Sequence, residues 1–260
     1  MAPGRPTAHI PTAGRFVFAH RGLNQQAPEN TEAAFHAAAE AGVQWIETDV
    51  DLAEDGTPVI MHDSTLDRTT NLGGPLSARG WEELRNADAG SWFSPEHAGT
   101  PLPTLSDVVD LINERGLNLN LELKPHETGA EGTLNLVDTV IAELGRLHPE
   151  RSLIISSFSP LTLYHFHQRA PQHQIGMLWR GATIPPDWRS VLEMVGATYA
   201  HIEDQSATPE VLAELRDAGY GINVWTVNDP RRAADLFNWG CTGVFSDVAD
   251  TLIPQPTREG

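Results

Sequence analysis

Residues 16–52 read FVFAHRGLNQQAPENTEAAFHAAAEAGVQWIETDVDL and contain the unit that decides the fold. A short β-rich run (16–20) is followed by an alanine-rich helical segment (31–42) and by a second β-rich run (43–52). A strand, a helix and a strand in this order are typical of parallel strands joined by helical crossovers. We therefore expect an α/β protein.

The same alternation continues along the chain. We expect eight strands, near residues 16–20, 44–51, 117–124, 152–156, 174–178, 198–202, 221–227 and 242–246. Helices are expected between them, near residues 31–41, 104–115, 130–146, 160–169, 187–195, 208–218 and 229–239. Eight β/α units in 260 residues predict one TIM-type (β/α)8 barrel domain over residues 1–260. A doubly wound open sheet is the alternative.

The segment Asp63–Pro103 interrupts this alternation. It is rich in Gly, Pro and Trp and is too long for an ordinary loop. It follows a hairpin-like stretch, DLAEDGTPVIMHD (51–63), in which Asp55-Gly56 is a strong turn signal. We expect a small insertion after the second strand, either a lid on the substrate side or a subdomain that seals the scaffold.

Composition excludes several classes of function. Lys+Arg 17 against Asp+Glu 35 gives a net charge of -18, which disfavours nucleic acid or an anionic membrane as a partner. Cys241 is the only cysteine, so intrachain disulfides and cysteine-rich metal sites are excluded and Cys241 is expected in the core. Residues 1–15 lack the apolar region of a secretory signal, and no apolar stretch approaches 18 residues. We expect a cytoplasmic protein.

Acidic residues alternate along the second strand. Glu47, Asp49 and Asp51 share one face because side chains alternate across a strand. Inside a barrel their mutual repulsion requires a cation, and hard divalent metals prefer oxygen ligands. The alternative is a strand end exposed to solvent.

The third strand, LNLNLELK (117–124), alternates as well. Its leucines are expected to pack against helices, and its polar residues to face the barrel axis. A buried parallel strand is normally apolar on both faces, so this polarity indicates a site. We expect Glu122 to join Glu47 and Asp49, and Lys124 to balance their charge or hold a phosphate oxygen.

Two histidines also end strand-like runs, His20 in FAHRG and His62 in VIMHD. Imidazole titrates near neutral pH, so the pair is suited to general acid and base catalysis. Arg21 adds a planar group suited to phosphate, and His201, within a strand, is a weaker candidate. In Pro28-Glu29-Asn30-Thr31, Asn30 or Thr31 is expected to cap the following helix, with Asn30 favoured.

These motifs carry a family resemblance. The stretch from Ala19 to Asn71 resembles glycerophosphodiester phosphodiesterases in its His-Arg-Gly, Pro-Glu-Asn-Thr, Glu-x-Asp and His-Asp motifs. The later motifs LELK, SSFSP, VWTVN and GCTGVFSD are similar too, so the resemblance runs from about Phe16 to Asp247. One departure is Ser246, where Thr often precedes the last aspartate.

The resemblance implies a TIM-type barrel and one divalent metal ion, Mg²⁺ or Ca²⁺. It implies hydrolysis of a small-molecule glycerophosphodiester to glycerol 3-phosphate and an alcohol, such as choline or ethanolamine. The nucleophile implied is the substrate's own glycerol hydroxyl, with a cyclic phosphate that water then opens. The site residues implied are His20 and His62 as acid and base, Arg21, Glu29, Lys124, Phe158 and Trp225 for phosphate and substrate, and Glu47, Asp49 and Glu122 for the metal.

Other functions stay open at this point. A phospholipase D-like enzyme acting on lysophospholipids or sphingolipids would need an apolar rim, for which Trp92, Phe93, Trp179 and Trp188 are candidates. A catalytically silent phosphodiester-binding module would retain the scaffold alone. Without the resemblance, a sugar-phosphate isomerase or an aldolase using Lys124 as a Schiff base would fit the same barrel. The sequence sets neither the oligomeric state nor the roles of the two histidines.

Overall fold

Eight parallel strands form a closed barrel in the computed structural model, which describes residues 15–124 and 129–253. β1 pairs with both β2 and β9, and this double pairing closes the ring. The predicted TIM-type barrel is therefore confirmed, and the open-sheet alternative is wrong. The barrel strands are β1 (Phe16–His20), β2 (Trp45–Leu52), β4 (Asn118–Leu123), β5 (Leu153–Ser157), β6 (Gln174–Trp179), β7 (Tyr199–Glu203), β8 (Gly221–Trp225) and β9 (Gly243–Ser246).

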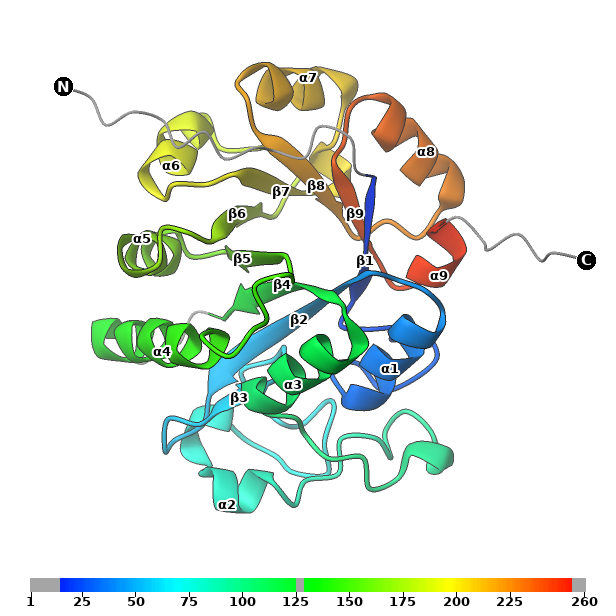
Figure 1. The fold of residues 1–260 in the computed structure, drawn as a ribbon, viewed down its shortest axis with the longest axis vertical. Coiled ribbons are helices and arrows are strands. Elements are labelled where there is room, and N and C mark those ends of the chain that lie inside the picture. Colours follow the sequence, from blue (N-terminus) through cyan, green and yellow to red (C-terminus); the bar gives the residue numbers. More distant parts are fainter. Residues whose placement is uncertain (1–14, 125–128, 254–260) are drawn as a thin grey trace, which may run out of the picture.

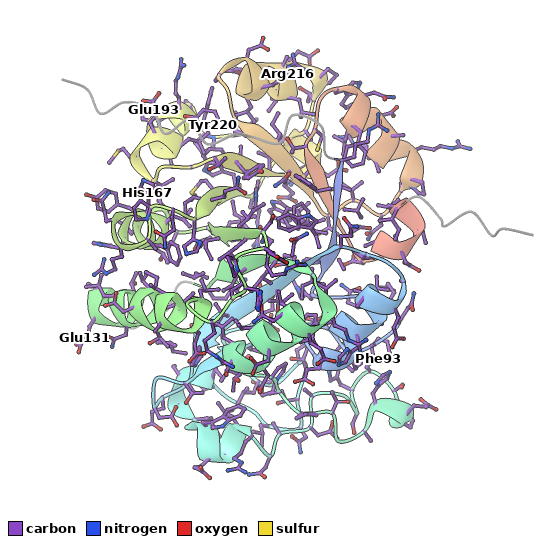
Figure 2. All side chains as sticks on the ribbon, in the orientation of Figure 1. Phe93, Glu131, His167, Glu193, Arg216 and Tyr220 are labelled. Carbon is purple, nitrogen blue, oxygen red and sulfur yellow. The ribbon has the colours of Figure 1, made fainter. Side chains whose placement is uncertain are left out.

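Helices surround the barrel (Figure 1). They are α1 (Glu32–Glu40), α3 (Leu105–Arg115), α4 (Gly129–Leu144), α5 (Pro160–Arg169), α6 (Trp188–Met194), α7 (Pro209–Asp217), α8 (Pro230–Asn238) and α9 (Ala249–Leu252). Leu119, Leu121 and Leu123 are fully buried in the main apolar core, as their alternation predicts. Glu131, Glu193 and Arg216 project from the outer faces of α4, α6 and α7 (Figure 2). Burial of the apolar face of each helix against the sheet fixes the ring.

Aromatic side chains fill the inside of the barrel. Phe18, Trp45, Ile154, Tyr199 and Phe245 form a separate buried cluster, in which the rings of Phe18 and Phe245 stack 4.5 Å apart. Along most of their strands, these residues come before the polar residues that face the barrel axis. The barrel is therefore a packed core with a polar site left at its carboxyl-terminal rim.

The insertion (residues 63–103) has a small core of its own. It follows β3 (Pro58–Ile60), which pairs antiparallel with β2 and completes the expected hairpin. It contains two short 3-10 turns, η1 (Leu76–Ala78) and η2 (Pro95–His97), and the short helix α2 (Trp81–Leu84). The insertion residues Leu66, Leu76 and Leu84 are fully or almost fully buried and pack in one cluster. In Figure 1 this segment lies beside β3 and α3, outside the ring of barrel helices.

The loop between β1 and α1 is packed closely against the helix. Gly22 has a φ of 80°, and a Cβ at this position would lie 2.6 Å from the Cβ of Ala34. Thr31, not Asn30, is the residue that caps α1, because its side chain accepts a hydrogen bond from the backbone N–H of Ala34. The capping role expected for Asn30 is wrong: Asn30 has a φ of 57° and turns its side chain toward β2.

The described helices include none that is long and apolar enough to cross a membrane. We expect no secretory signal in residues 1–15. Residues 1–14 lie outside the described residues. Cys241 is buried, as predicted.

Candidate active site

Strand register brings three carboxylates together. In the pairing of β2 with β4, Asp49 stands opposite Glu122, and in the pairing of β1 with β2, His20 stands opposite Glu47. Glu47, Asp49 and Glu122 are buried, and one oxygen of each lies within 4.8 Å of the others. Asp51, which the alternation along β2 places with Glu47 and Asp49, does not belong to this group.

Two cations lie against the carboxylate cluster. The Nζ of Lys124 is 2.7 Å from Oε1 of Glu122 and 3.3 Å from Oδ1 of Asp49. The Nε of Arg21 is 3.6 Å from Oδ2 of Asp49, and the backbone N–H of Arg21 donates to Glu47. Lys124 therefore balances carboxylate charge, which is one of the two roles expected for it.

The charge balance of the cluster is incomplete. Burial, followed by repulsion from Asp49, raises the pKa of Glu47 well above its usual value and that of Glu122 to about 7. Burial alone would also raise the pKa of Asp49, but Lys124 and Arg21 outweigh it and hold this pKa below its usual range. With all three carboxylates ionised, the two cations would leave one negative charge unbalanced in a buried place, and the raised pKa values reflect this deficit of positive charge. The donor set fits a hard divalent cation, which prefers oxygen ligands.

Asn30 orients the central carboxylate. Its Nδ2 donates to Oδ2 of Asp49 at 2.8 Å, and its Oδ1 accepts from the hydroxyl of Thr48 at 2.7 Å. Both partners are buried on β2. Asn30 is thus a site residue. The sequence did not indicate this role, because Asn30 lies among residues typical of a helix start.

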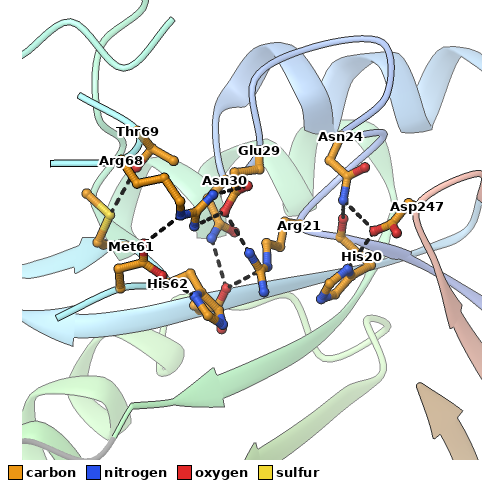
Figure 3. Close-up of polar contacts among 12 residues, drawn as sticks. His20, Arg21, Asn24, Glu29, Asn30, Met61, His62, Arg68, Thr69 and Asp247 are labelled. Carbon is orange, nitrogen blue, oxygen red and sulfur yellow. Dashed lines mark hydrogen bonds and ion pairs between the residues drawn. The ribbon is translucent and has the colours of Figure 1, made fainter. Parts of the chain in front are cut away.

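Each candidate catalytic histidine is held by a carboxylate. The Nδ1 of His20 lies 2.7 Å from Oδ1 of Asp247, and the Nδ1 of His62 lies 2.6 Å from Oδ1 of Asp63 (Figure 3). With Nδ1 engaged in this way, Nε2 is the ring nitrogen left to exchange a proton. Burial lowers the pKa of His62 below its usual value, although Asp49 opposes this.

Asp247 is itself anchored by two amides. Asn24 donates to its Oδ1 at 2.6 Å and Asn228 to its Oδ2 at 2.8 Å. Burial would raise the pKa of Asp247, but the hydrogen bond from His20 and those from the two amides keep it well below the usual range. This carboxylate is charged and fixed in orientation near neutral pH.

An ionic chain joins Arg21 to His62. Arg21 donates to Glu29 at 2.7 Å, and Arg68 of the insertion donates to both oxygens of Glu29 at 2.8 Å (Figure 3). The Nε of Arg68 donates to Oδ2 of Asp63 at 2.6 Å, and this hydrogen bond helps to lower the pKa of Asp63 to about 2. The insertion therefore contacts the site directly, in addition to having a core of its own.

A pocket of about 110 Å³ opens at this rim. His20, His62, Arg21, Glu47 and Glu122 line it. Three other predicted site residues, Asp49, Lys124 and Glu29, do not line the pocket. Each of them contacts a residue that does.

Aromatic residues line the other part of the pocket. Phe158 follows β5 and Trp225 ends β8, and their rings meet edge to face with centroids 5.6 Å apart. Arg180, which sequence analysis did not single out, lies over both rings. His201 is fully buried inside the barrel, where its Nε2 is 3.1 Å from Nδ2 of Asn223, and it does not line the pocket.

The model of the glycerophosphoryl diester phosphodiesterase family matches residues 20–251. The chain belongs to this family. A glycerophosphodiester phosphodiesterase of Caldanaerobacter subterraneus subsp. tengcongensis is 34% identical over 91% of this chain and 96% of its own length. One of Bacillus altitudinis is 30% identical, with the same two shares. The predicted family and the predicted enzyme class, a phosphodiesterase, are confirmed.

Solved structures of family members agree with this assignment. A phosphodiesterase of Oleispira antarctica, in complex with the product sn-glycerol-3-phosphate, superposes with a TM-score of 0.87 at 34% identity, over 91% of this chain and 94% of that one. A glycerophosphodiester phosphodiesterase of Thermotoga maritima superposes with a TM-score of 0.73 at 25% identity, over 92% of this chain and 97% of that one.

Sequence reasoning about this phosphodiesterase missed the partners of the predicted residues. Asp63 and Asp247 occur inside quoted motifs, as the aspartates of HD and FSD, and this was the available signal. Arg68 and Arg180 carried no comparable signal, because their contacts join segments far apart in the chain.

Proposed function

We propose that this phosphodiesterase hydrolyses glycerophosphodiesters to glycerol 3-phosphate and an alcohol, with His20 and His62 as its acid and base and one Mg²⁺ or Ca²⁺ ion. The observation that carries the proposal is the placement of both histidines, each held at Nδ1 by a carboxylate, on the pocket that Glu47 and Glu122 also line. The glycerol 3-phosphate bound by the Oleispira relative supports this choice of product.

Glu47, Asp49 and Glu122 would hold the metal ion. When bound, the ion supplies positive charge to the phosphoryl oxygens as negative charge develops on them. Lys124, which contacts two of these ligands, keeps their oxygens in place and offsets part of their charge. Asn30 fixes the orientation of Asp49 from the other side.

Arg21 binds the phosphate group. Its side chain lines the pocket, and Glu29 holds one end of the guanidinium. The remaining N–H groups of the planar fork are suited to phosphoryl oxygens. This local cation matters because a net charge of -18 repels an anionic substrate.

The histidines move the protons. The Nε2 of one takes the proton from the attacking hydroxyl, either of the substrate's glycerol or of water, while the Nε2 of the other gives a proton to the leaving alkoxide. When the first becomes imidazolium, its carboxylate partner, Asp247 for His20 or Asp63 for His62, stabilises the new charge. Attack through the glycerol hydroxyl gives a cyclic phosphate, and a second cycle with reversed roles opens it with water.

Replacement of each histidine tests the proposal. His20→Ala and His62→Ala should lower kcat on a glycerophosphodiester by roughly 1,000-fold or more, with circular dichroism unchanged. His148→Ala is the control, because His148 lies away from this pocket, between α4 and β5. Turnover of His62→Ala close to that of the unmodified protein would refute the assignment.

The rival functions gain little from the structure. Two of the four aromatic residues considered for a lipid-facing rim, Trp179 and Trp188, are buried in the main core. Trp92, in the insertion, is 40% exposed. We propose a small-molecule substrate in a cytoplasmic setting, with neither nucleic acid nor a membrane as a stable partner. A comparison of glycerophosphocholine with a micellar lysolipid separates this proposal from a phospholipase D-like activity.

A further inference from the structure

Arg180 stands across the barrel from Arg21, the residue proposed to bind phosphate. It directly follows β6, and β6 is the fourth strand from β1 in either direction around the closed ring. Its guanidinium carbon is 5.3 Å from the ring centroid of Phe158 and 6.0 Å from that of Trp225. All three residues line the same pocket as His20 and Arg21.

The charge of Arg180 is not balanced by a neighbour. Among residues 15–124 and 129–253, no carboxylate forms an ion pair with it. Glu203, at the end of the adjacent strand β7, instead accepts a hydrogen bond from the backbone N–H of Gly181 at 2.7 Å. The other cations near the pocket, Arg21 and Lys124, both contact carboxylates. Arg180 is therefore a pocket cation with its charge available to a ligand.

This arrangement has a consequence for the alcohol half of the substrate. Aromatic faces are the usual binding surface for a quaternary ammonium group, but here a guanidinium already covers them and repels a second cation. An anionic group meets the opposite situation, because a guanidinium stacked on rings donates charge-assisted hydrogen bonds from its edge. If Arg21 holds the phosphodiester, the part of the pocket lined by Arg180 is the space left for the alcohol group.

We propose that Arg180 is a specificity-determining residue, which favours glycerophosphodiesters whose alcohol carries a second anionic group over those with cationic alcohols such as choline. The inference rests on the proposed function, since it concerns the choice of leaving alcohol in that reaction. It deepens the assignment of the pocket without changing the roles of His20 and His62.

Three substrates that differ in the charge of the alcohol provide the test. They are glycerophosphocholine (cationic), glycerophosphoglycerol (neutral) and glycerophosphoglycerol phosphate (anionic), each measured as kcat/KM at low ionic strength. The unmodified protein should prefer the anionic over the cationic substrate by about tenfold, and raised salt should reduce this ratio.

Variants at one position then assign the ratio to Arg180. Arg180→Gln should reduce the preference to about twofold or less, Arg180→Glu should invert it, and Arg180→Lys should retain part of it, since the charge remains and the planar stack is lost. Arg216→Gln removes the same charge from the outer end of α7 and should leave the ratio unchanged (Figure 2).

Two results would overturn the inference in different ways. If Arg180→Glu changes kcat/KM by the same factor for all three substrates, the enzyme is a glycerophosphodiesterase but Arg180 does not select the alcohol. If none of the three substrates is turned over, the proposed function itself fails.

Discussion

Arg68 donates hydrogen bonds from its two terminal nitrogens to the two oxygens of Glu29, at 2.8 Å each. The same guanidinium donates from Nε to Asp63, which holds His62. Arg68 belongs to the insertion, and Glu29 to the loop that carries Arg21 over the barrel rim. One side chain thus couples the position of Arg21, the residue proposed to bind phosphate, to that of a candidate catalytic histidine.

Loss of Arg68 should impair turnover although Arg68 does not line the pocket. Arg68→Met should lower kcat/KM roughly 10- to 100-fold, because small displacements of positioned groups are costly to catalysis. Arg68→Lys should be intermediate, since lysine cannot make the two parallel hydrogen bonds. Arg85→Met, which removes an exposed arginine from the same insertion, is the control. Equal kcat/KM in Arg68→Met and the control would show that this coupling has no catalytic effect.

Asp247 should control the tautomer of His20. The amide of Asp247→Asn can donate a hydrogen bond to Nδ1, and this favours the tautomer of His20 that carries its proton on Nε2. In that tautomer Nε2 cannot accept a proton. We expect kcat to fall about 100-fold or more, with a small change in KM. Asp217→Asn, at an exposed position on α7, should behave as the unmodified protein. Retention of half of the activity in Asp247→Asn would contradict a positioning role.

Metal binding can be measured without turnover. Calorimetric titration with Mg²⁺ and with Ca²⁺ should show binding that Glu122→Gln weakens at least about tenfold, because one anionic ligand is lost. Asp51→Asn removes the acidic residue of β2 that lies outside the cluster, and should retain the affinity. Chelation should abolish activity, and readdition of the metal should restore it. An unchanged affinity in Glu122→Gln would remove this residue from the ligand set.

His201 should make stability depend on pH. Burial lowers the pKa of His201 to about 3, from 6.5. The unfolded chain therefore binds this proton near pH 6.5 while the folded protein does not, so the contribution to stability is full above about pH 6.5 and is lost as the pH falls toward 3. The loss is about 1.4 kcal/mol per pH unit within that window.

Urea unfolding of the unmodified protein and of His201→Gln checks this. The difference in unfolding free energy between them should shrink by about 1 to 2 kcal/mol between about pH 7 and pH 5.5, since other groups titrate alike in both. Gly176 leaves room for the imidazole, because a Cβ there would lie 2.4 Å from the His201 ring. A difference that stays constant with pH would show that His201 titrates normally.

The sequence predicted the barrel because its signals are local. The alternation of Leu119 and Leu121 with Asn120 and Glu122 depends only on the strand period of two, and burial of the leucines follows from it. The carboxylate cluster was also predictable, since adjacent parallel strands place equivalent positions side by side.

Contacts that join distant segments could not be predicted in this way. The contact between His20 and Asp247 spans 227 residues, and the one between Arg68 and Glu29 spans 39. The prediction for Asn30 failed for a different reason: the helix was expected to start at residue 31, one residue earlier than observed, and asparagine is a favoured capping residue. Only the three-dimensional position of β2 provides the partners that its amide binds instead.

Lys124, wedged between Asp49 and Glu122, is the one lysine in the 260-residue sequence. Reagents that acylate or reductively alkylate amines therefore have one side-chain target on this molecule, Lys124, besides the α-amine of the chain. Because Lys124 is largely buried and ion-paired, its labelling in a mapped peptide would report that the acidic cluster has opened, while attachment through the α-amine would leave this site untouched.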